Sequence, residues 1–198
     1  MQDREQRTLS RGVEVRADDG APTTLIGYAA IFGAETEIAG LFREVIKPGA
    51  FTAAVGRDDV RALFNHDPNF VIGRTTSGTL TLSEDETGLR YTVTPPNTTW
   101  ANDLMVSVAR GDISQSSFAF RVTEEKWIDS GKRDVLPLRE ILSVDLFDVS
   151  PVAYPAYEST TVSARAQAAA ALHVPVVPFD ADRRRMGIRR RELALRGF

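Results

Sequence analysis

Short segments in which hydrophobic and polar residues alternate recur along most of the chain, and turn-forming residues separate them. Thr79–Leu82 and Leu89–Val93 alternate strictly, which is the period-two pattern of a strand with one buried face. The acidic cluster Glu84–Gly88 between them predicts a hairpin connection. The full set of predicted strands is Val13–Arg16, Thr24–Phe32, Phe42–Ile46, Val60–Asn65, Gly78–Leu82, Leu89–Val93, Ile113–Val122, Val135–Leu142 and Val144–Val152.

Helical patterns are fewer. A short helix is predicted from Pro48 through Val55, because proline suits the first helical position and Gly56 follows as a stop. A second is predicted over Trp100–Arg110, where apolar residues recur every four positions. The residues expected to end this second helix are Thr98 or Thr99 as the cap and Gly111 as the stop. Many short strands with two or three helices predict a mainly β fold with flanking helices (α+β), built as a β-barrel.

Composition separates a domain from a tail. The chain has 198 residues, of which 42% are hydrophobic and 26% charged, as in ordinary globular proteins. Residues 1–163 are predicted to form one domain, and residues 164–198 an Ala/Pro-rich linker with a basic tail. The tail carries a net charge of +5 and the remainder −8. Two interpretations have equal weight: the tail docks to an acidic partner, or its arginines form the solvated face of a short helix. No aromatic residue lies among the tail arginines, so no nucleic-acid partner is expected.

Several functional classes are excluded or not supported. The chain has no cysteine, which excludes disulfides, thiolate metal sites and a cysteine-protease mechanism. No apolar run reaches the roughly 20 residues of a membrane span, and no signal peptide is expected at the charged N-terminus. The two histidines, His66 and His173, lie far apart and no glycine-rich phosphate loop occurs. We therefore expect no metal, no cofactor and no membrane partner.

Ser117 is the candidate nucleophile. On a strand, Ser117 and Ala119 lie opposite the face that carries Phe118 and Phe120, so the pattern predicts an accessible hydroxyl on a rigid support, with Ser116 on the apolar face. A serine hydroxyl needs a general base, most often histidine. His173 lies in an Ala-rich, Pro-broken stretch, whereas His66 ends a strand-like run before the turn signal Asp67-Pro68. His66 is therefore the expected base, although most strand serines are only structural.

Several sequence blocks together resemble one known family. They occur in the order Gly27–Phe32, Phe42–Phe51, Asn65–Asp67, Ser117–Phe120, Asp148–Val152 and Pro155–Tyr157. The family that they resemble is the head maturation (prohead) proteases of tailed phages, of the Hong Kong 97 type, which are related to herpesvirus assemblin. The resemblance covers roughly residues 10–165. It implies an assemblin-like β-barrel fold, His66 as the family's histidine and Ser117 as its nucleophile, with Ala119 where the family commonly has glycine.

The third catalytic residue is less clearly marked. Assemblin relatives use a second histidine, but His173 lies beyond the predicted domain, and a carboxylate is the natural substitute. Asp148 matches the acid of the family's acid-Val-Ser block. Asp145 is the second candidate, and strand alternation would place it on the face opposite Asp148. Asp67 is expected to cap the turn at Pro68 instead. The alternative for Asp148 is a structural ion pair with Arg139 or Arg121.

The resemblance implies a serine endopeptidase that processes scaffold or capsid protein, and itself, during maturation of a phage or phage-like capsid. Its implied partners are the scaffold segment of the major capsid protein and the portal-bearing prohead, in the bacterial host cytoplasm; self-association is a further expectation. We also expect self-cleavage in or near residues 160–182. The alternatives are a catalytically inactive capsid-assembly or scaffold module of the same fold, and an unrelated β-barrel binding module.

Overall fold

The structure is a computed structural model, and it describes residues 4–9, 13–16, 23–132 and 135–154. It confirms a mainly β fold with flanking helices, of which the described residues contain two. The predicted domain boundary at residue 163, the basic tail, His173 and the expected self-cleavage region lie outside the described residues. Within the described ranges, no helix is long and apolar enough to cross a membrane.

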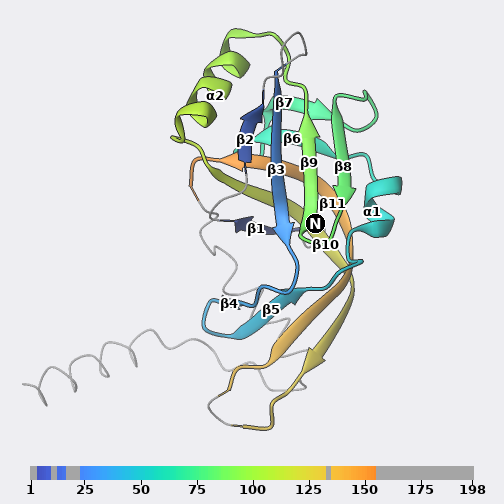
Figure 1. Cartoon of the computed structure of the whole chain (residues 1–198). Helices are drawn as coiled ribbons and strands as arrows, with labels where there is room; N and C mark the ends of the chain where they lie inside the picture. Colours follow the sequence, from blue (N-terminus) through green and yellow to red (C-terminus); the bar gives the residue numbers. More distant parts are fainter. Residues whose placement is uncertain (1–3, 10–12, 17–22, 133–134, 155–198) are drawn as a thin grey trace, which may run out of the picture.

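The helices and strands carry the labels of Figure 1. Strands precede and follow each of the two helices, as the chain order shows. In that order the elements are β1 (Glu5–Leu9), β2 (Val13–Arg16), β3 (Thr24–Ile31), β4 (Thr36–Ile38), β5 (Phe42–Ile46), α1 (Thr52–Arg57), β6 (Arg61–Phe64), β7 (Asp67–Arg74), β8 (Leu80–Glu84), β9 (Gly88–Val93), α2 (Thr99–Arg110), β10 (Gln115–Ile128) and β11 (Leu138–Val152).

The strands form two sheets. One has the order β1-β10-β11-β5-β4, with β6 pairing with β11 and β7 with β6, and the other has the order β2-β3-β9-β8. β11 is the central strand of the larger sheet. It pairs antiparallel with β10 over its length and, on its other side, parallel first with β5 and then with β6. Figure 1 shows that the ends of β10 and β11 continue as a hairpin beyond the rest of the body.

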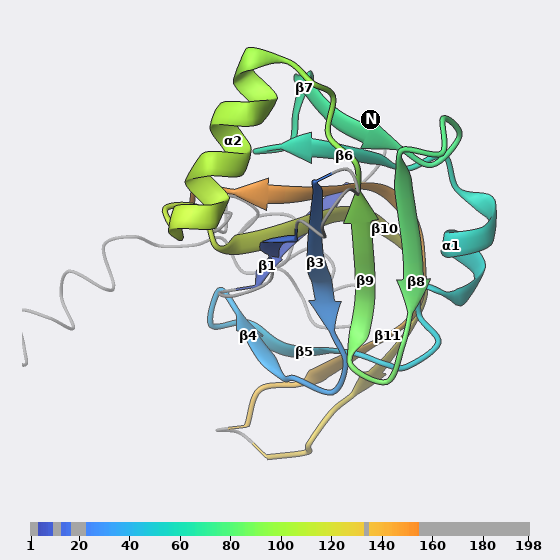
Figure 2. The ribbon, with the colours of Figure 1, turned by 45° about the horizontal axis from the view of Figure 1, so that its top comes forward.

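One hydrophobic core lies between the two sheets. In Figure 2 the strands β3, β9 and β8 pass in front of β10 and β11 and run across them, as the opposite walls of a barrel would. Alternating residues of each sheet point into this space because one face of each strand is apolar. Among the side chains that fill it are Leu25, Leu89 and Tyr91 from the smaller sheet, Phe118, Phe120 and Val149 from the larger one, and Leu104 and Val108 from α2.

The predicted strands are present, with one merger and three additions. The segments predicted as 135–142 and 144–152 form the single long strand β11. The structure adds β1, β4 and β7. β1 and β4 are short, largely polar strands, so their sequences lack the apolar alternation that marks a buried face. β7 begins at Asp67 because the turn lies two positions earlier, at Asn65 and His66, than the Asp67-Pro68 signal suggested.

The second helix matches its prediction, and the first is shifted. α2 ends at Arg110, and the Gly111 that follows has a φ of +82°, the left-handed conformation that glycine adopts at helix ends. Thr98 is its N-terminal flanking residue but makes no side-chain capping hydrogen bond. α1 begins only at Thr52, and Gly56 lies inside it rather than stopping it. Position 56 needs no positive φ, so glycine there is not required by the backbone.

These two glycines should therefore respond in opposite ways to alanine. Gly56→Ala should raise the free energy of unfolding by about 0.4–1 kcal/mol, because alanine restricts the unfolded chain and no atom beyond the adjoining residues and the backbone of its own helix lies within 4 Å of the added methyl group. Gly111→Ala should lower it by about 1 kcal/mol or more, because alanine is strained at positive φ. Denaturant unfolding of both variants checks this, and equal effects of the two would contradict these positions of the helix ends.

Candidate active site

The strand β11 brings three distant parts of the chain together. Its residue Asp148 lies opposite Ala119 of β10 on one side and opposite Arg61 of β6 on the other. Ser117 is two residues before Ala119 on β10, and β6 leads directly into the turn that carries His66. The sheet therefore places a serine, an aspartate and a histidine next to one another.

The turn between β6 and β7 fixes the position of the histidine ring. Asn65 and His66 have φ values of +53° and +58°, which is the backbone of a tight two-residue hairpin turn. Positive φ is uncommon for residues other than glycine, although Asn and His tolerate it better than most. Two hydrogen bonds hold the turn against the end of β11: Asn65 N–H donates to Pro151 O at 3.1 Å, and Ala153 N–H donates to Asn65 Oδ1 at 2.9 Å.

The three candidate residues from the sequence form one hydrogen-bonded chain. His66 Nδ1 lies 2.5 Å from Asp148 Oδ1, and His66 Nε2 lies 2.7 Å from Ser117 Oγ. A carboxylate can only accept a hydrogen bond, so Nδ1 carries the ring proton and donates it to Asp148. Nε2 is then the acceptor that faces the Ser117 hydroxyl. This order of groups matches that of a serine, a general base and an acid that orients the base.

Asp148 is nearly fully buried, with 1% of its side chain exposed. Its Oδ1 also accepts a hydrogen bond from Ser150 Oγ at 3.0 Å, and its Oδ2 forms an ion pair with Arg4. The predicted alternatives, an ion pair with Arg139 or Arg121, are not what the structure shows. A buried carboxylate is stable only when such donors surround it. Ser150 and Arg4 therefore help to fix the Asp148 carboxyl group beside His66.

Ser117 is fully buried, with an exposed fraction of 0%, so the expectation of an accessible hydroxyl is wrong. The reason is β1, which the sequence pattern did not reveal. This strand pairs with β10, with Thr8 opposite Ser117. The Ser117 hydroxyl also lies 2.8 Å from the main-chain oxygen of Arg7.

Ser116 lies on the core side, as the alternation predicted. Its hydroxyl donates to the Tyr91 hydroxyl at 3.0 Å, inside the core between the sheets. Burial raises the pKa of Tyr91, so this phenol stays protonated. The two neighbouring serines therefore differ in surroundings: one belongs to the core and the other to the His66–Asp148 chain.

Asp145 does not belong to this chain, but the reason expected from the sequence is wrong. Phe147 has no partner in the β10–β11 ladder, because Ala119 pairs with Asp148 and Phe120 with Leu146. Such a bulge reverses the alternation, so Asp145 and Asp148 lie on the same face of the sheet. Asp145 is instead held by Arg121 and, at 2.5 Å, by Arg57. Asp67 makes the local bond expected around Pro68, since its Oδ1 accepts from Asn69 N–H at 2.8 Å, although the chain reverses at Asn65 and His66.

Burial lowers the pKa of His66 to about 4, and the positive charge of Arg4 adds to this effect. The carboxylate of Asp148 acts in the opposite direction, because an anion beside the ring favours imidazolium. With burial dominant, the ring is neutral at neutral pH. A neutral ring with Nε2 unprotonated is the form that can accept a proton from a hydroxyl.

Three residues that contribute to this arrangement were not identified as such from the sequence. Ser150 follows Asp148 by two positions, and strand alternation could have placed it on the same face. Asn65 precedes His66, and Asn at such a position is a signal for a tight turn with positive φ. Arg4 left no signal, because its contact with Asp148 spans most of the domain.

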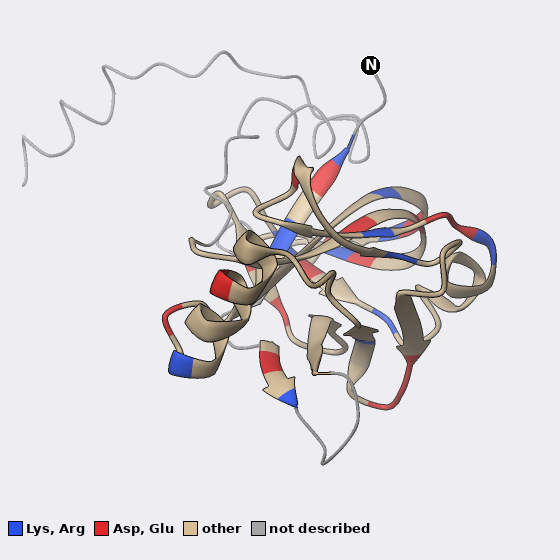
Figure 3. Cartoon of the chain, turned by 90° about the horizontal axis from the view of Figure 1, so that it is seen from above, with Lys and Arg blue, Asp and Glu red and all other residues tan. Residues whose placement is uncertain are grey.

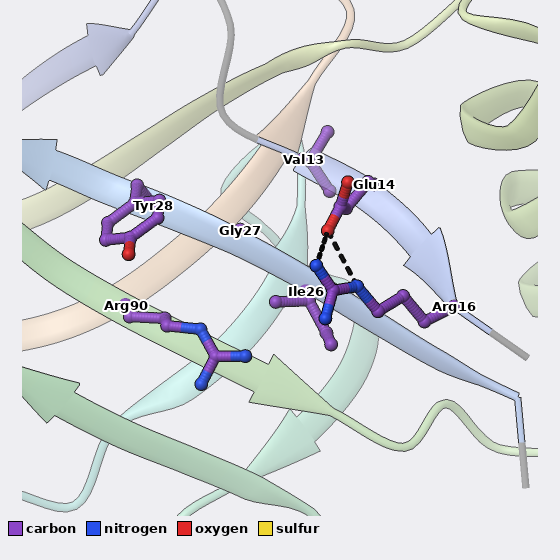
Figure 4. Close-up of a pocket in the computed structure, with 7 residues that line it drawn as sticks. All are labelled: Val13, Glu14, Arg16, Ile26, Gly27, Tyr28 and Arg90. Atoms are coloured by element: carbon purple, nitrogen blue, oxygen red, sulfur yellow. Dashed lines mark hydrogen bonds and ion pairs between the residues drawn. The ribbon is translucent and has the colours of Figure 1, made fainter. Parts of the chain in front are cut away.

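A hollow on the outer face of the smaller sheet lies apart from these residues. Figure 4 shows Glu14, Arg16, Tyr28 and Arg90 around it, with Glu14 and Arg16 forming an ion pair along β2. None of its lining residues takes part in the Ser117–His66–Asp148 chain. Across the described part of the chain, no group of three or more acidic or histidine side chains stands together in a way that could hold a metal ion.

The comparison with protein families agrees with the resemblance seen in the sequence. The family model described as Caudovirus prohead serine protease matches residues 11–174, and the chain belongs to that family. Among solved structures, the chain is similar to the capsid assembly protease gp21 of bacteriophage T4, with a TM-score of 0.49 and 11% sequence identity. The similarity covers 77% of this chain and 98% of that one. A comparison with curated proteins finds no match.

The lowered pKa of His66 makes the stability of the fold depend on pH. The unfolded chain binds a proton at His66 below about pH 6.5, whereas the folded chain binds it only near pH 4. This part of the free energy of unfolding is therefore present above pH 6.5 and is lost as pH falls from 6.5 to about 4.

Between about pH 7 and pH 5.5 the loss should be on the order of 1 kcal/mol. Urea unfolding at both pH values, compared with the His66→Gln variant, measures it. An NMR titration of the ring should show no protonation above pH 5.5. A ring that titrates near pH 6.5 or higher would contradict the dominance of burial over the charge of Asp148.

Proposed function

We propose that the chain is a serine endopeptidase that cleaves scaffold or capsid protein segments while a phage or phage-like head assembles. Ser117 would be the nucleophile, His66 the general base and Asp148 the residue that orients His66. Membership of the prohead serine protease family supports this proposal. The observation that carries it is the unbroken hydrogen-bonded chain from Asp148 through His66 to Ser117. By the same reasoning its partners are capsid or scaffold proteins of assembling proheads in the host cytoplasm.

The proposed chemistry follows from the positions of the protons. His66 Nε2 accepts the proton of Ser117 as the serine oxygen attacks the carbonyl carbon of the peptide bond. The protonated His66 then gives this proton to the leaving amine, and the acyl group stays on Ser117 as an ester. Water, deprotonated by the same nitrogen, hydrolyses the ester and frees the serine. Throughout, Asp148 accepts from Nδ1–H and stabilises the positive charge that forms on the ring.

An inactive module of the same fold is less well supported. Burying an aspartate, a histidine and a serine in one place costs free energy that apolar residues of similar size would not. The turn that presents His66 also holds two non-glycine residues at positive φ. Such strain is often found where a function requires it. A module without catalysis has no need of either feature.

The two neighbouring serines offer a matched test. Ser117→Ala should abolish cleavage of the scaffold segment, because removing a nucleophile costs on the order of 10⁶ in rate. Ser116→Ala should keep its activity and lose only about 1 kcal/mol of stability, because Tyr91 loses a buried hydrogen-bond partner. Gel or mass-spectrometric assays of cleavage check the first result and thermal unfolding the second. An active Ser117→Ala together with a dead Ser116→Ala would show that the wrong serine was assigned.

Asp148 and Asp145, which lie on the same face of the sheet, offer a second matched test. Asp148→Asn should lower kcat by about 10⁴, because the amide no longer holds His66 in the tautomer that accepts from Ser117. Asp145→Asn is the control, since Asp145 pairs with Arg57 and Arg121 instead; it should keep its activity. Steady-state kinetics on one peptide substrate compares them. If Asp145→Asn lost as much activity as Asp148→Asn, the role of Asp148 would have to be withdrawn.

A further inference from the structure

The N-terminal strand β1 lies along the edge of the strand that carries Ser117. It runs antiparallel to β10, with Thr8 opposite Ser117 and Arg7 opposite Phe118. In the described part of the sheet β1 is an outermost strand, paired only with β10. Figure 3 shows acidic and basic residues following one another along the strand that starts from the label N. Addition of an extended segment to a sheet edge is a common mode of peptide recognition.

The main chain of β1 meets the Ser117 hydroxyl. The carbonyl oxygen of Arg7 lies 2.8 Å from Ser117 Oγ, and His66 Nε2 lies 2.7 Å from the same atom. A hydroxyl has one proton, so it can donate fully to only one of these two acceptors. β1 thus places a peptide carbonyl oxygen beside the Ser117 hydroxyl, where it competes with His66 for the hydroxyl proton.

The side chain of Arg7 enters a buried acidic site. Its Nε lies 2.6 Å from Glu44 Oε1 and its Nη2 lies 2.9 Å from Glu44 Oε2. The guanidinium also lies over the ring of Phe120, 5.5 Å from its centre. Only 4% of the Glu44 side chain is exposed. Two parallel hydrogen bonds to one carboxylate match the planar guanidinium group and not the ammonium group of lysine.

Glu44 has a second cation nearby, but that cation is shared. Arg139 Nη1 lies 3.0 Å from Glu44 and 2.8 Å from Glu5, and Arg139 also binds Glu125. If β1 left the sheet, Glu5 and Arg7 would leave together, and the carboxylates of Glu44 and Glu125 would share Arg139 alone. A buried carboxylate that is short of a positive partner is costly. The vacated site therefore favours the arrival of another guanidinium group.

We propose that β1 occupies the place of the substrate strand, and that Glu44 selects peptides with arginine at the position of Arg7. This inference rests on the proposed function. The bond that is cut follows the arginine: Ser117 Oγ forms an ester with the arginine carbonyl carbon, the C–N bond breaks, and the leaving amine takes the proton from His66. Water then hydrolyses the ester and leaves a carboxylate on the arginine. Until β1 is displaced, it acts as an internal competitor of such substrates.

The covering role of β1 is tested by the reactivity of Ser117 in the full chain. Arg7→Ala should raise the rate at which a fluorophosphonate labels Ser117 roughly tenfold or more, because two charge-assisted hydrogen bonds that hold β1 are lost. Arg16→Ala is the control, since Arg16 pairs with Glu14 at the hollow in Figure 4, and its labelling rate should equal that of the wild type. Arg7→Lys keeps the charge without the paired hydrogen bonds and should be intermediate.

Thermal unfolding verifies that each variant is folded. If Arg7→Ala does not fold, the labelling rate of Arg7→Lys is compared with that of the wild type instead. Equal labelling rates in the wild type and in every folded Arg7 variant would overturn the covering role of β1.

The selective role of Glu44 is tested by cleavage of a peptide mixture that varies at one position, with the products identified by mass spectrometry. The Arg7→Ala chain should cut mainly after arginine. Adding Glu44→Gln should lower this cleavage roughly 10- to 100-fold while labelling of Ser117 stays unchanged. Labelling of Ser117 without preference for arginine, or a preference that Glu44→Gln leaves intact, overturns the inference alone. Absence of both labelling and cleavage in every folded variant contradicts the proposed function as well.

Discussion

The position of β11 between β10 and β6 is the constraint on which the rest of the structure depends. β10 carries Ser117, and β6 ends at the turn that carries His66, and neither strand pairs with the other. The two strands are positioned relative to each other through their ladders with β11, which itself carries Asp148. Backbone hydrogen bonds set strand spacing to within a few tenths of an ångström. The distances of 2.5 Å from His66 to Asp148 and 2.7 Å from His66 to Ser117 therefore follow from the order of the three strands.

Burial gives the same arrangement its electrostatic character. Asp148 and Ser117 are almost completely removed from water, so each hydrogen bond among them acts in a medium where it is stronger than at the surface. The same burial keeps His66 neutral despite the neighbouring carboxylate. Part of this burial comes from the N-terminal segment, through Arg4 at Asp148 and Arg7 at Ser117. The surroundings of the histidine are thus shared between the sheet and a strand that could leave it, so displacement of β1 would also change the proton affinity of the ring.

A second buried charge cluster links β1 to the hairpin end of the large sheet. Arg139 on β11 is 2% exposed and contacts acidic residues of β1, β5 and β10. Such a cluster is costly if any one member is removed and balanced when all are present. Its composition makes the fit of β1 specific for charge rather than for apolar shape. These charge contacts explain why a strand as polar as β1 can pair with the edge of the sheet.

Much of the fold and the identity of the candidate residues could be predicted from the sequence, because local patterns determine them. Alternation separated Ser116 from Ser117, and the hairpin at residues 84–88 and the glycine that ends α2 were visible as short-range signals. The rest depended on contacts between distant segments. The polar strand β1 has no apolar period, so only its docking on β10 reveals that Ser117 is covered. The bulge at Phe147 interrupts the alternation of β11 and places Asp145 on the same face of the sheet as Asp148. Only the tertiary structure decided these points, because strand order, bulges and edge pairing arise from the whole sheet and leave no mark in any one segment.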